Sequence, residues 1–132
     1  MNAMNDMNAR SRMPANLKSS APHIAGASRW DQDLKDWGAV EGMLEGQSRA
    51  SGALLHKGGD GTEAGIWVCT PGFWECVVTR SEMCHFVGGR CTYTHESGEV
   101  VEVEPDTAVF FPKGWKGTCR VHETVRKVYM IC

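Results

Sequence analysis

The sequence lacks several features that mark whole classes of protein. Its 132 residues carry 14 Lys and Arg against 16 Asp and Glu, a formal net charge of −2, so there is no basic surplus for binding nucleic acid. No apolar run approaches the roughly 18–20 residues that cross a bilayer. The first residues, Met1 to Asn8, lack the charged and then apolar segments of a secretory signal. We therefore expect a single domain in the cytoplasm, with neither nucleic acid nor membrane as a partner.

Six cysteines are present, yet no two are spaced as the Cys-x2-Cys pair of a zinc knuckle. Most lie in apolar, strand-like runs, where a free cysteine behaves as a small buried hydrophobic residue. We predict reduced structural thiols rather than disulfides. They are Cys69, Cys76, Cys84, Cys91, Cys119 and Cys132.

The N-terminal part has no hydrophobic period. Residues 1–28 are rich in Met, Asn, Ser, Ala and Pro, which predicts a flexible or disordered leader before a single domain over 29–132. Trp30, Leu34 and Trp37 then recur at i, i+4 and i+7, a spacing that predicts a short helical turn packed on the domain.

Short strands are predicted for most of the remaining chain, after a flexible connector at 56–61. Turn residues recur at regular intervals, which is typical of an antiparallel all-β barrel or sandwich with its core over about 50–131. The expected strands are 65–69, 73–79, 82–87, 90–95, 99–104, 107–111, 117–122 and 125–131.

A tight turn at Pro112 and Gly114 resembles the second sequence motif of the cupins, Gly-x5-Pro-x-Gly-x2-His-x3-Asn. The motif's metal-binding histidine is replaced by Gly117, its first glycine by Asp106 and its last asparagine by Val121. The turn is therefore retained while the chemistry that it usually positions is missing.

The first cupin motif, Gly-x5-His-x-His-x3–4-Glu-x6-Gly, is matched only in its second half. Glu82 and Gly89 have the required spacing. The histidine pair falls at Glu75 and Val77 if the variable gap is four residues long, or one residue later if it is three. Neither register contains histidine, so Glu82 is the one residue that remains of the four expected metal ligands.

The amino-acid sequences of these segments are similar to those of the ethanolamine-utilisation-type cupins, a family that includes domains likened to (S)-ureidoglycine aminohydrolase. The similarity covers roughly residues 50–132, and its most specific parts are the strings at 111–117 and 123–129. It implies an antiparallel cupin-type jelly-roll β-barrel with a ligand site inside.

Side chains of a strand alternate between its two faces. If Glu82 points into the barrel, as the resemblance implies, Cys84 does so as well, and an inward Gly117 brings Cys119 inward. Glu75 joins them if the four-residue gap applies. Two carboxylates and two thiolates can bind zinc, which is one alternative for this set. Because the histidines are missing, we predict instead a barrel without metal or other cofactor.

A carboxylate inside an apolar barrel needs a partner. Arg126 and Lys127 alternate on the last predicted strand, so one faces inward and can pair with Glu82, and the sequence leaves open which one. Trp115 follows the tight turn and is the aromatic side chain that we expect nearest the pocket entrance.

These residues favour a module that binds a small polar metabolite, with Glu82 as its anchor. One alternative is an enzyme like (S)-ureidoglycine aminohydrolase that acts on a carbon–nitrogen bond of a small ureido or amino compound. A further alternative is an accessory or structural protein of a metabolic assembly. The surplus of aromatic residues and the apolar segment at Trp30 predict a homodimer.

Overall fold

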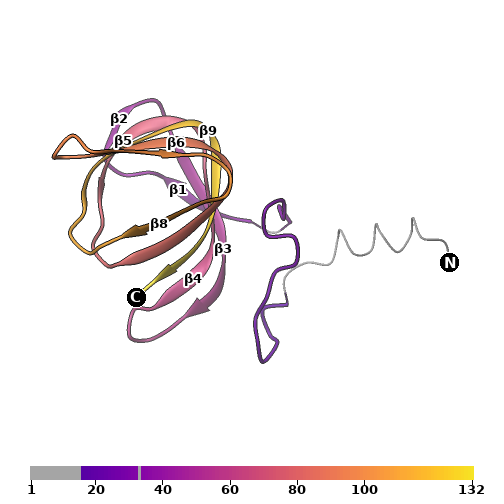
Figure 1. Cartoon of the computed structure of the whole chain (residues 1–132). Coiled ribbons are helices and arrows are strands. Elements are labelled where there is room, and N and C mark those ends of the chain that lie inside the picture. The colour runs from indigo at the N-terminus through magenta and orange to yellow at the C-terminus, as the bar shows by residue number, and fades with distance from the viewer. Residues whose placement is uncertain (1–15, 33) are drawn as a thin grey trace.

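The computed structural model describes residues 16–32 and 34–132, and within these ranges every regular element is a strand. Figure 1 shows one sheet that curls into a barrel, which confirms the all-β antiparallel prediction. No helix in the described ranges is long and apolar enough to cross a bilayer. The strands are β1 (Lys35–Ala39), β2 (Met43–Glu45), β3 (Arg49–Lys57), β4 (Glu63–Cys69), β5 (Gly72–Val77), β6 (Glu82–His95), β7 (Val100–Val103), β8 (Thr107–Phe111) and β9 (Lys116–Ile131).

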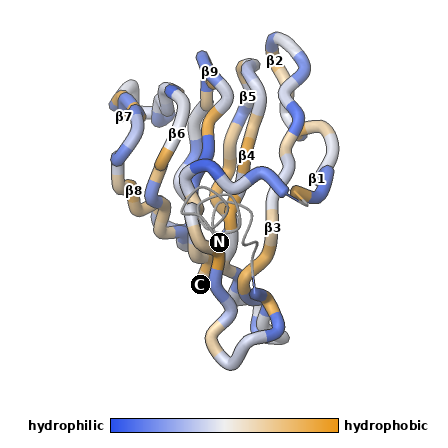
Figure 2. Tube along the Cα trace, turned by 90° about the vertical axis from the view of Figure 1, so that its right-hand side faces the viewer, coloured by the Kyte–Doolittle hydropathy of each residue, from blue (hydrophilic) through white to orange (hydrophobic). Residues whose placement is uncertain are grey.

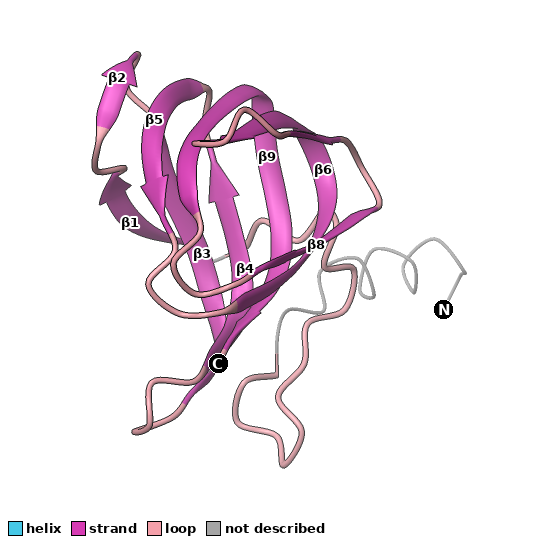
Figure 3. Ribbon diagram, turned by 60° about the vertical axis from the view of Figure 1, so that its left-hand side comes forward, coloured by secondary structure: helices cyan, strands magenta, loops and turns pink. Residues whose placement is uncertain are grey.

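The two longest strands, β6 and β9, organise the sheet. The order β1-β3-β4-β9-β5-β2 runs through β9, whose first half pairs with β5 and whose second half pairs with β4. On its other side, β9 pairs along its length with β6 (Figure 3). β6 in turn pairs with β7 and β8. All pairings between these strands are antiparallel, so the directions of β6 and β9 fix those of the other strands.

The predicted pairs of strands at 82–87 with 90–95 and at 117–122 with 125–131 are each one continuous strand. In β6 the interruption is a bend with register shifts between Phe86 and Arg90 rather than a turn. Gly89 has a φ of 77° and packs so closely on Thr124 that a Cβ would collide with its carbonyl oxygen. Glycine therefore permits the bend, and the sheet continues on both sides of it.

The barrel interior is apolar. Alternation on β6 and β9 buries Cys84 and Cys119, as the sequence predicts, and also Phe86 and Val121. Tyr93 lies among them, with its ring centroid 4.8 Å from that of Phe111. Figure 2 shows the most hydrophobic stretches along the central strands and hydrophilic ones in many connections. The cupin-type interior is thus filled largely by aromatic rings and thiols.

The helical turn predicted from Trp30, Leu34 and Trp37 is wrong. Residues from Lys35 onward form β1, which pairs with β3, and Trp30 is 6% exposed in a second apolar cluster with Ala53 and Ile66 on the outer side of the sheet. Edge pairing with β3 satisfies the backbone hydrogen bonds that a helix would otherwise make.

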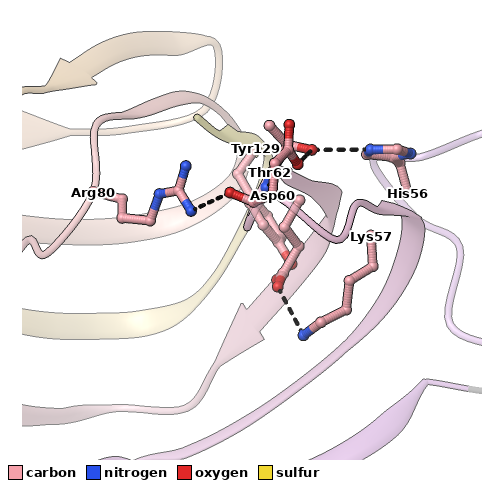
Figure 4. A network of polar contacts seen from close by, with 7 residues as sticks. His56, Lys57, Asp60, Thr62, Arg80 and Tyr129 are labelled. Atoms are coloured by element: carbon pink, nitrogen blue, oxygen red, sulfur yellow. Dashed lines mark hydrogen bonds and ion pairs between the residues drawn. The ribbon is translucent and has the colours of Figure 1, made fainter.

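The flexible connector predicted at 56–61 is also wrong. His56 and Lys57 end β3, and the loop after them is closed by hydrogen bonds that Figure 4 displays. Thr62 donates its backbone N–H (3.1 Å) and its hydroxyl (2.7 Å) to Asp60 Oδ1, and Arg80 donates to the Asp60 carbonyl at 2.9 Å. The loop is a hairpin connection between β3 and β4, not a linker.

Of the predicted leader, residues 1–15 lie outside the described residues. Its later part contacts the domain, because Ile24 and Ala27 pack against the cluster around Trp30. Arg126 on β9 fixes this segment by donating to the carbonyl oxygens of Ala27 and Trp30.

Candidate functional site

A buried ion pair joins the two long strands. Lys127 Nζ on β9 lies 2.6 Å from Glu82 Oε2 at the start of β6, and the two side chains are only 11% and 17% exposed. Arg126, the neighbouring residue on β9, points to the outer side of the sheet and holds the N-terminal segment. The structure therefore assigns the inward position to Lys127.

Aromatic rings surround the Lys127 ammonium. Its Nζ lies 4.4 Å from the ring centroid of Trp67, 5.8 Å from that of Tyr129 and 5.9 Å from that of Phe86. Trp67 is in register with Lys127 across β4 and β9, so both side chains lie on the inner face. Ring faces attract cations, and they stabilise the ammonium where water is scarce.

The protonation of Lys127 follows from these neighbours. Burial lowers the pKa of the ammonium, but the charge and hydrogen bond of Glu82, together with the neighbouring Cys84 and Cys76, raise the pKa above its ordinary value. Lys127 is thus a cation at neutral pH and has no lone pair with which to attack a substrate.

Cys84 completes the inner hydrogen bonding by donating its thiol to Glu82 Oε2 at 3.0 Å. Burial, together with the nearby Glu82 charge, raises the pKa of Cys84 far above its usual range. The thiol is therefore neutral, and Cys84 supports the carboxylate rather than acting as a nucleophile.

A cleft of about 270 Å³ opens beside this ion pair, and we refer to it as the Lys127 cleft. Its floor includes Tyr129, which donates its hydroxyl to Glu63 Oε2 at 2.6 Å. Glu63 also receives the Lys57 ammonium at 3.5 Å, and Figure 4 shows Lys57 and Tyr129 beside the β3–β4 loop. The lining residues are Trp37, Glu63, Trp67, Glu82, Lys127, Tyr129 and Ile131.

The sequence does not predict several of the lining residues as part of the site. Trp37 comes from β1, where the sequence predicts a helical turn, and Glu63 lies between the predicted connector at 56–61 and the predicted strand at 65–69. Trp67 and Tyr129 were part of predicted strands, and the alternation that placed Lys127 would have placed Tyr129 on the same face. No local sequence pattern indicates that Trp37 or Glu63 lies near Lys127, because only the pairing of the strands brings these residues together.

Besides Arg126, three other predicted site residues lie away from the cleft. Glu75 is exposed on the outer face of β5, where Trp74 and not Glu75 points inward, so its expected position inside the barrel is wrong. Cys119 is completely buried and does not line the cleft. Trp115 packs with Phe111, at a centroid distance of 5.2 Å, rather than at the entrance of the Lys127 cleft.

The residues at the family's metal position do not fit a metal ion. Gly117 stands in place of a histidine and lies so close to β6 that a Cβ would collide with the Thr94 carbonyl oxygen. The remaining carboxylate, Glu82, is already paired with Lys127. In the described part of the chain, no three His, Cys, Asp or Glu side chains come together as metal ligands. Because Glu75 is outside, the alternative zinc set does not converge either.

A hydroxyl–imidazole contact lies on the outer surface. Thr92 Oγ1 is 2.8 Å from His122 Nε2 and 2.9 Å from Glu102 Oε2. In a catalytic triad the acid orients the imidazole, whereas Glu102 here contacts the hydroxyl. All three side chains are solvent-accessible, so we assign the contact to surface hydrogen bonding.

The comparisons with known proteins identify the fold. The family described as EutQ-like cupin domain matches residues 57–129. The EutQ protein of Clostridium difficile has a TM-score of 0.55 and 16% identity, with 64% of this chain and 68% of that chain covered. A putative ethanolamine utilization protein Q from Salmonella typhimurium has a TM-score of 0.56 and 18% identity, covering 71% and 76%.

A protein of unknown function from Pseudomonas syringae pv. tomato superposes with a TM-score of 0.69 at 19% identity. The match covers 75% of this chain but only 44% of that one, so the chain spans less than half of its length. At these identities the solved structures establish the fold alone. No curated protein matches the sequence.

Proposed function

The chain belongs to the EutQ-like cupin domain family, and we propose that it binds a small polar metabolite in the Lys127 cleft. The observation that supports this most is the Lys127–Glu82 pair, which is nearly buried and still opens on a cleft. Binding sites commonly combine apolar and aromatic walls with a few convergent polar groups. The Lys127 cleft has this composition, and its volume suits a small molecule.

A purely structural ion pair is a weaker explanation for these residues. Removing two charges from water is costly, and well-packed apolar residues often stabilise a fold equally well. A ligand gains from a charged pair held in place by aromatic rings and a thiol, because little reorganisation is needed on binding.

Catalysis like that of (S)-ureidoglycine aminohydrolase is less well supported. The side chains at the family's metal position do not fit a metal, and the protonated Lys127 and neutral Cys84 are poor nucleophiles. We propose that the protein works without a bound metal. Elemental analysis of protein from metal-supplemented medium should then give far less than one equivalent of Mn, Fe, Ni or Zn.

We also propose a cytoplasmic homodimer. All six cysteines are free thiols, which suits a reducing compartment. Phe110, Met83 and Met130 face outward in register on β8, β6 and β9, with 58%, 48% and 47% of each residue exposed. Such an apolar row across three strands is a suitable self-complementary contact.

The binding proposal can be tested by titrating a panel of small polar metabolites into the isotope-labelled protein and recording amide and indole NMR spectra. We expect a saturable ligand to shift the indole signals of Trp37 and Trp67 and the amide of Lys127. The variant Lys127→Met should lose this response. If no compound in the panel gives a saturable shift, or if the shifts map only to the outer face, the proposal is wrong.

A further inference from the structure

We propose that the ligand of the Lys127 cleft is a small organic ammonium compound rather than an anion or a neutral polar molecule. This inference rests on the proposed binding function and adds its chemical class. Three features of the cleft carry it: the balance of charge, the bonding capacity of Glu63, and the aromatic surface of Trp37.

The ionisable groups that line the cleft carry a net negative charge. Two carboxylates, Glu63 and Glu82, face one ammonium, Lys127, and their side chains are 24%, 17% and 11% exposed. Lys57 approaches Glu63 from outside at 3.5 Å, but its side chain is 68% exposed. Because the Lys57 ammonium is mostly in solvent and its contact is long, it compensates the Glu63 charge only in part. A cationic ligand would therefore neutralise the cleft.

An anionic ligand would meet a specific cost. An anion would have to compete with Glu82 for the Lys127 ammonium. The Glu82 carboxylate would then be left without its cation in a largely buried position. Leaving one member of a buried pair uncompensated is strongly unfavourable. A cation leaves the pair intact.

Glu63 has the capacity to accept a ligand ammonium. Its Oε2 receives the Tyr129 hydroxyl at 2.6 Å, while the one contact of its Oε1 among the described residues is the long one to Lys57. An ammonium group in the cleft can donate to Oε1 without breaking the bond from Tyr129. Glu63 is therefore the residue to which we assign the ligand's positive group.

The aromatic wall suits the same ligand. Trp67 already holds one ammonium, that of Lys127, at 4.4 Å from its ring centroid. Trp37 lines the cleft and is 37% exposed, so its ring is accessible to a ligand. Its position is set by Gly52, where a Cβ would collide with the Trp37 ring. Tryptophan is the ring that attracts organic cations most strongly.

The test compares probes of similar size and different charge by NMR titration of the full chain. The probes are choline, its neutral isostere 3,3-dimethylbutan-1-ol, n-butylammonium and butyrate. We expect at least one ammonium probe to bind about fivefold or more tightly than the neutral isostere, as cation–π attraction of about 1 kcal/mol requires. Butyrate should bind most weakly.

Two matched variants locate the effect. Glu63→Gln keeps an acceptor for the Tyr129 hydroxyl but removes a charge, so it should weaken ammonium binding about fivefold or more and leave the neutral isostere unchanged. Glu75→Gln makes the same change on the outer face and should alter neither.

The outcomes separate the two proposals. If butyrate or the neutral isostere binds in the cleft as tightly as the ammonium probes, the cleft is a binding site but the assignment to ammonium compounds is wrong. The same holds if Glu63→Gln has no effect. If none of the four probes shifts the signals of Trp37, Trp67 or Lys127, the ammonium assignment fails, and the metabolite panel decides separately on the binding function.

Discussion

The indole ring of Trp37 on β1 rests on the backbone of Gly52 on β3. A Cβ at position 52 would collide with both this ring and the carbonyl oxygen of Ile66. The absence of a side chain at Gly52 therefore lets two strands approach and places an aromatic wall at the Lys127 cleft.

Gly52→Ala should force either Trp37 or β4 to move. We expect a loss of roughly 2 kcal/mol in the free energy of unfolding, as for overpacked interiors, measured by urea denaturation. Gly59→Ala is the matched control, since nothing lies within 4 Å of its added Cβ, and it should change stability by less than about 0.5 kcal/mol. Equal effects of the two substitutions would contradict the assigned contact.

Lys127→Met should destabilise the protein by about 3 kcal/mol, because the Glu82 carboxylate loses its cation while remaining largely buried. Adding Glu82→Gln should recover most of this loss, since the amide needs no counter-charge. A double-mutant cycle from denaturant titrations measures both effects. Additive losses in the two single variants would show that the pair is not coupled.

Asp106 occupies the cupin motif's glycine position and has a φ of 70°, in the region that favours glycine. It contacts His85 at 2.7 Å, but its side chain is 91% exposed, so this pair contributes little. Asp106→Gly should therefore be neutral or slightly stabilising. Asp106→Ala should be about 1 kcal/mol less stable than Asp106→Gly. Thermal unfolding of both variants tests this, and a large loss in Asp106→Gly would mean that the His85 contact matters more.

Stability should fall steeply at alkaline pH. Burial raises the pKa of Cys69 from 9.0 to about 12, that of Cys76 from 9.0 to about 11 and that of Cys84 in the same direction. The hydrogen bond with Cys91, together with burial, raises the pKa of Cys119 as well. In the unfolded chain these thiols ionise near pH 9, while in the fold they keep their protons. Stability is thus intact below about pH 9 and decreases between the unfolded and folded pKa values, by about 1.4 kcal/mol per pH unit for each thiol.

Urea titrations from about pH 8 to pH 11 under reducing conditions measure this slope. Cys69→Ala should make it shallower, whereas Cys132→Ser, at an exposed position, should leave it unchanged. Lys127 adds to the decline only at higher pH, because its folded pKa lies above 10.5. A flat profile up to pH 11 would be inconsistent with buried thiols.

The proposed homodimer predicts a mass of two chains in light scattering at micromolar concentration. Phe110→Asp should shift the protein toward the monomer, since it places a charge in the apolar row with Met83 and Met130. Val100→Asp is the control, because this residue is 52% exposed on β7, outside that row. A monomer mass for the unmodified chain would refute the dimer.

Much of the architecture was predictable because it depends on local patterns. Period-two alternation and regular turn residues identified the strands from β4 to β9, and the tight turn at Pro112 and Gly114 indicated the cupin motif. The strand at Lys35–Ala39 was missed because three apolar residues at helical spacing outweighed the weak strand signal of a short edge. Its conformation depends on pairing with β3, whose first residue, Arg49, pairs with Ala39 across the intervening β2 and its loops, and no pattern within 35–39 itself signals that pairing.

For the site, strand alternation read from the sequence is enough to place Glu82 and Cys84 on one face and to turn either Arg126 or Lys127 inward. Alternation relates neighbours on one strand, but it does not say which of the two faces is buried. Strand pairing in the folded barrel selects Lys127, places Glu75 on the outer face and brings Trp37 and Glu63 to the same cleft. The register between the paired strands sets these positions, and this register results from packing of the whole barrel rather than from any local run of residues.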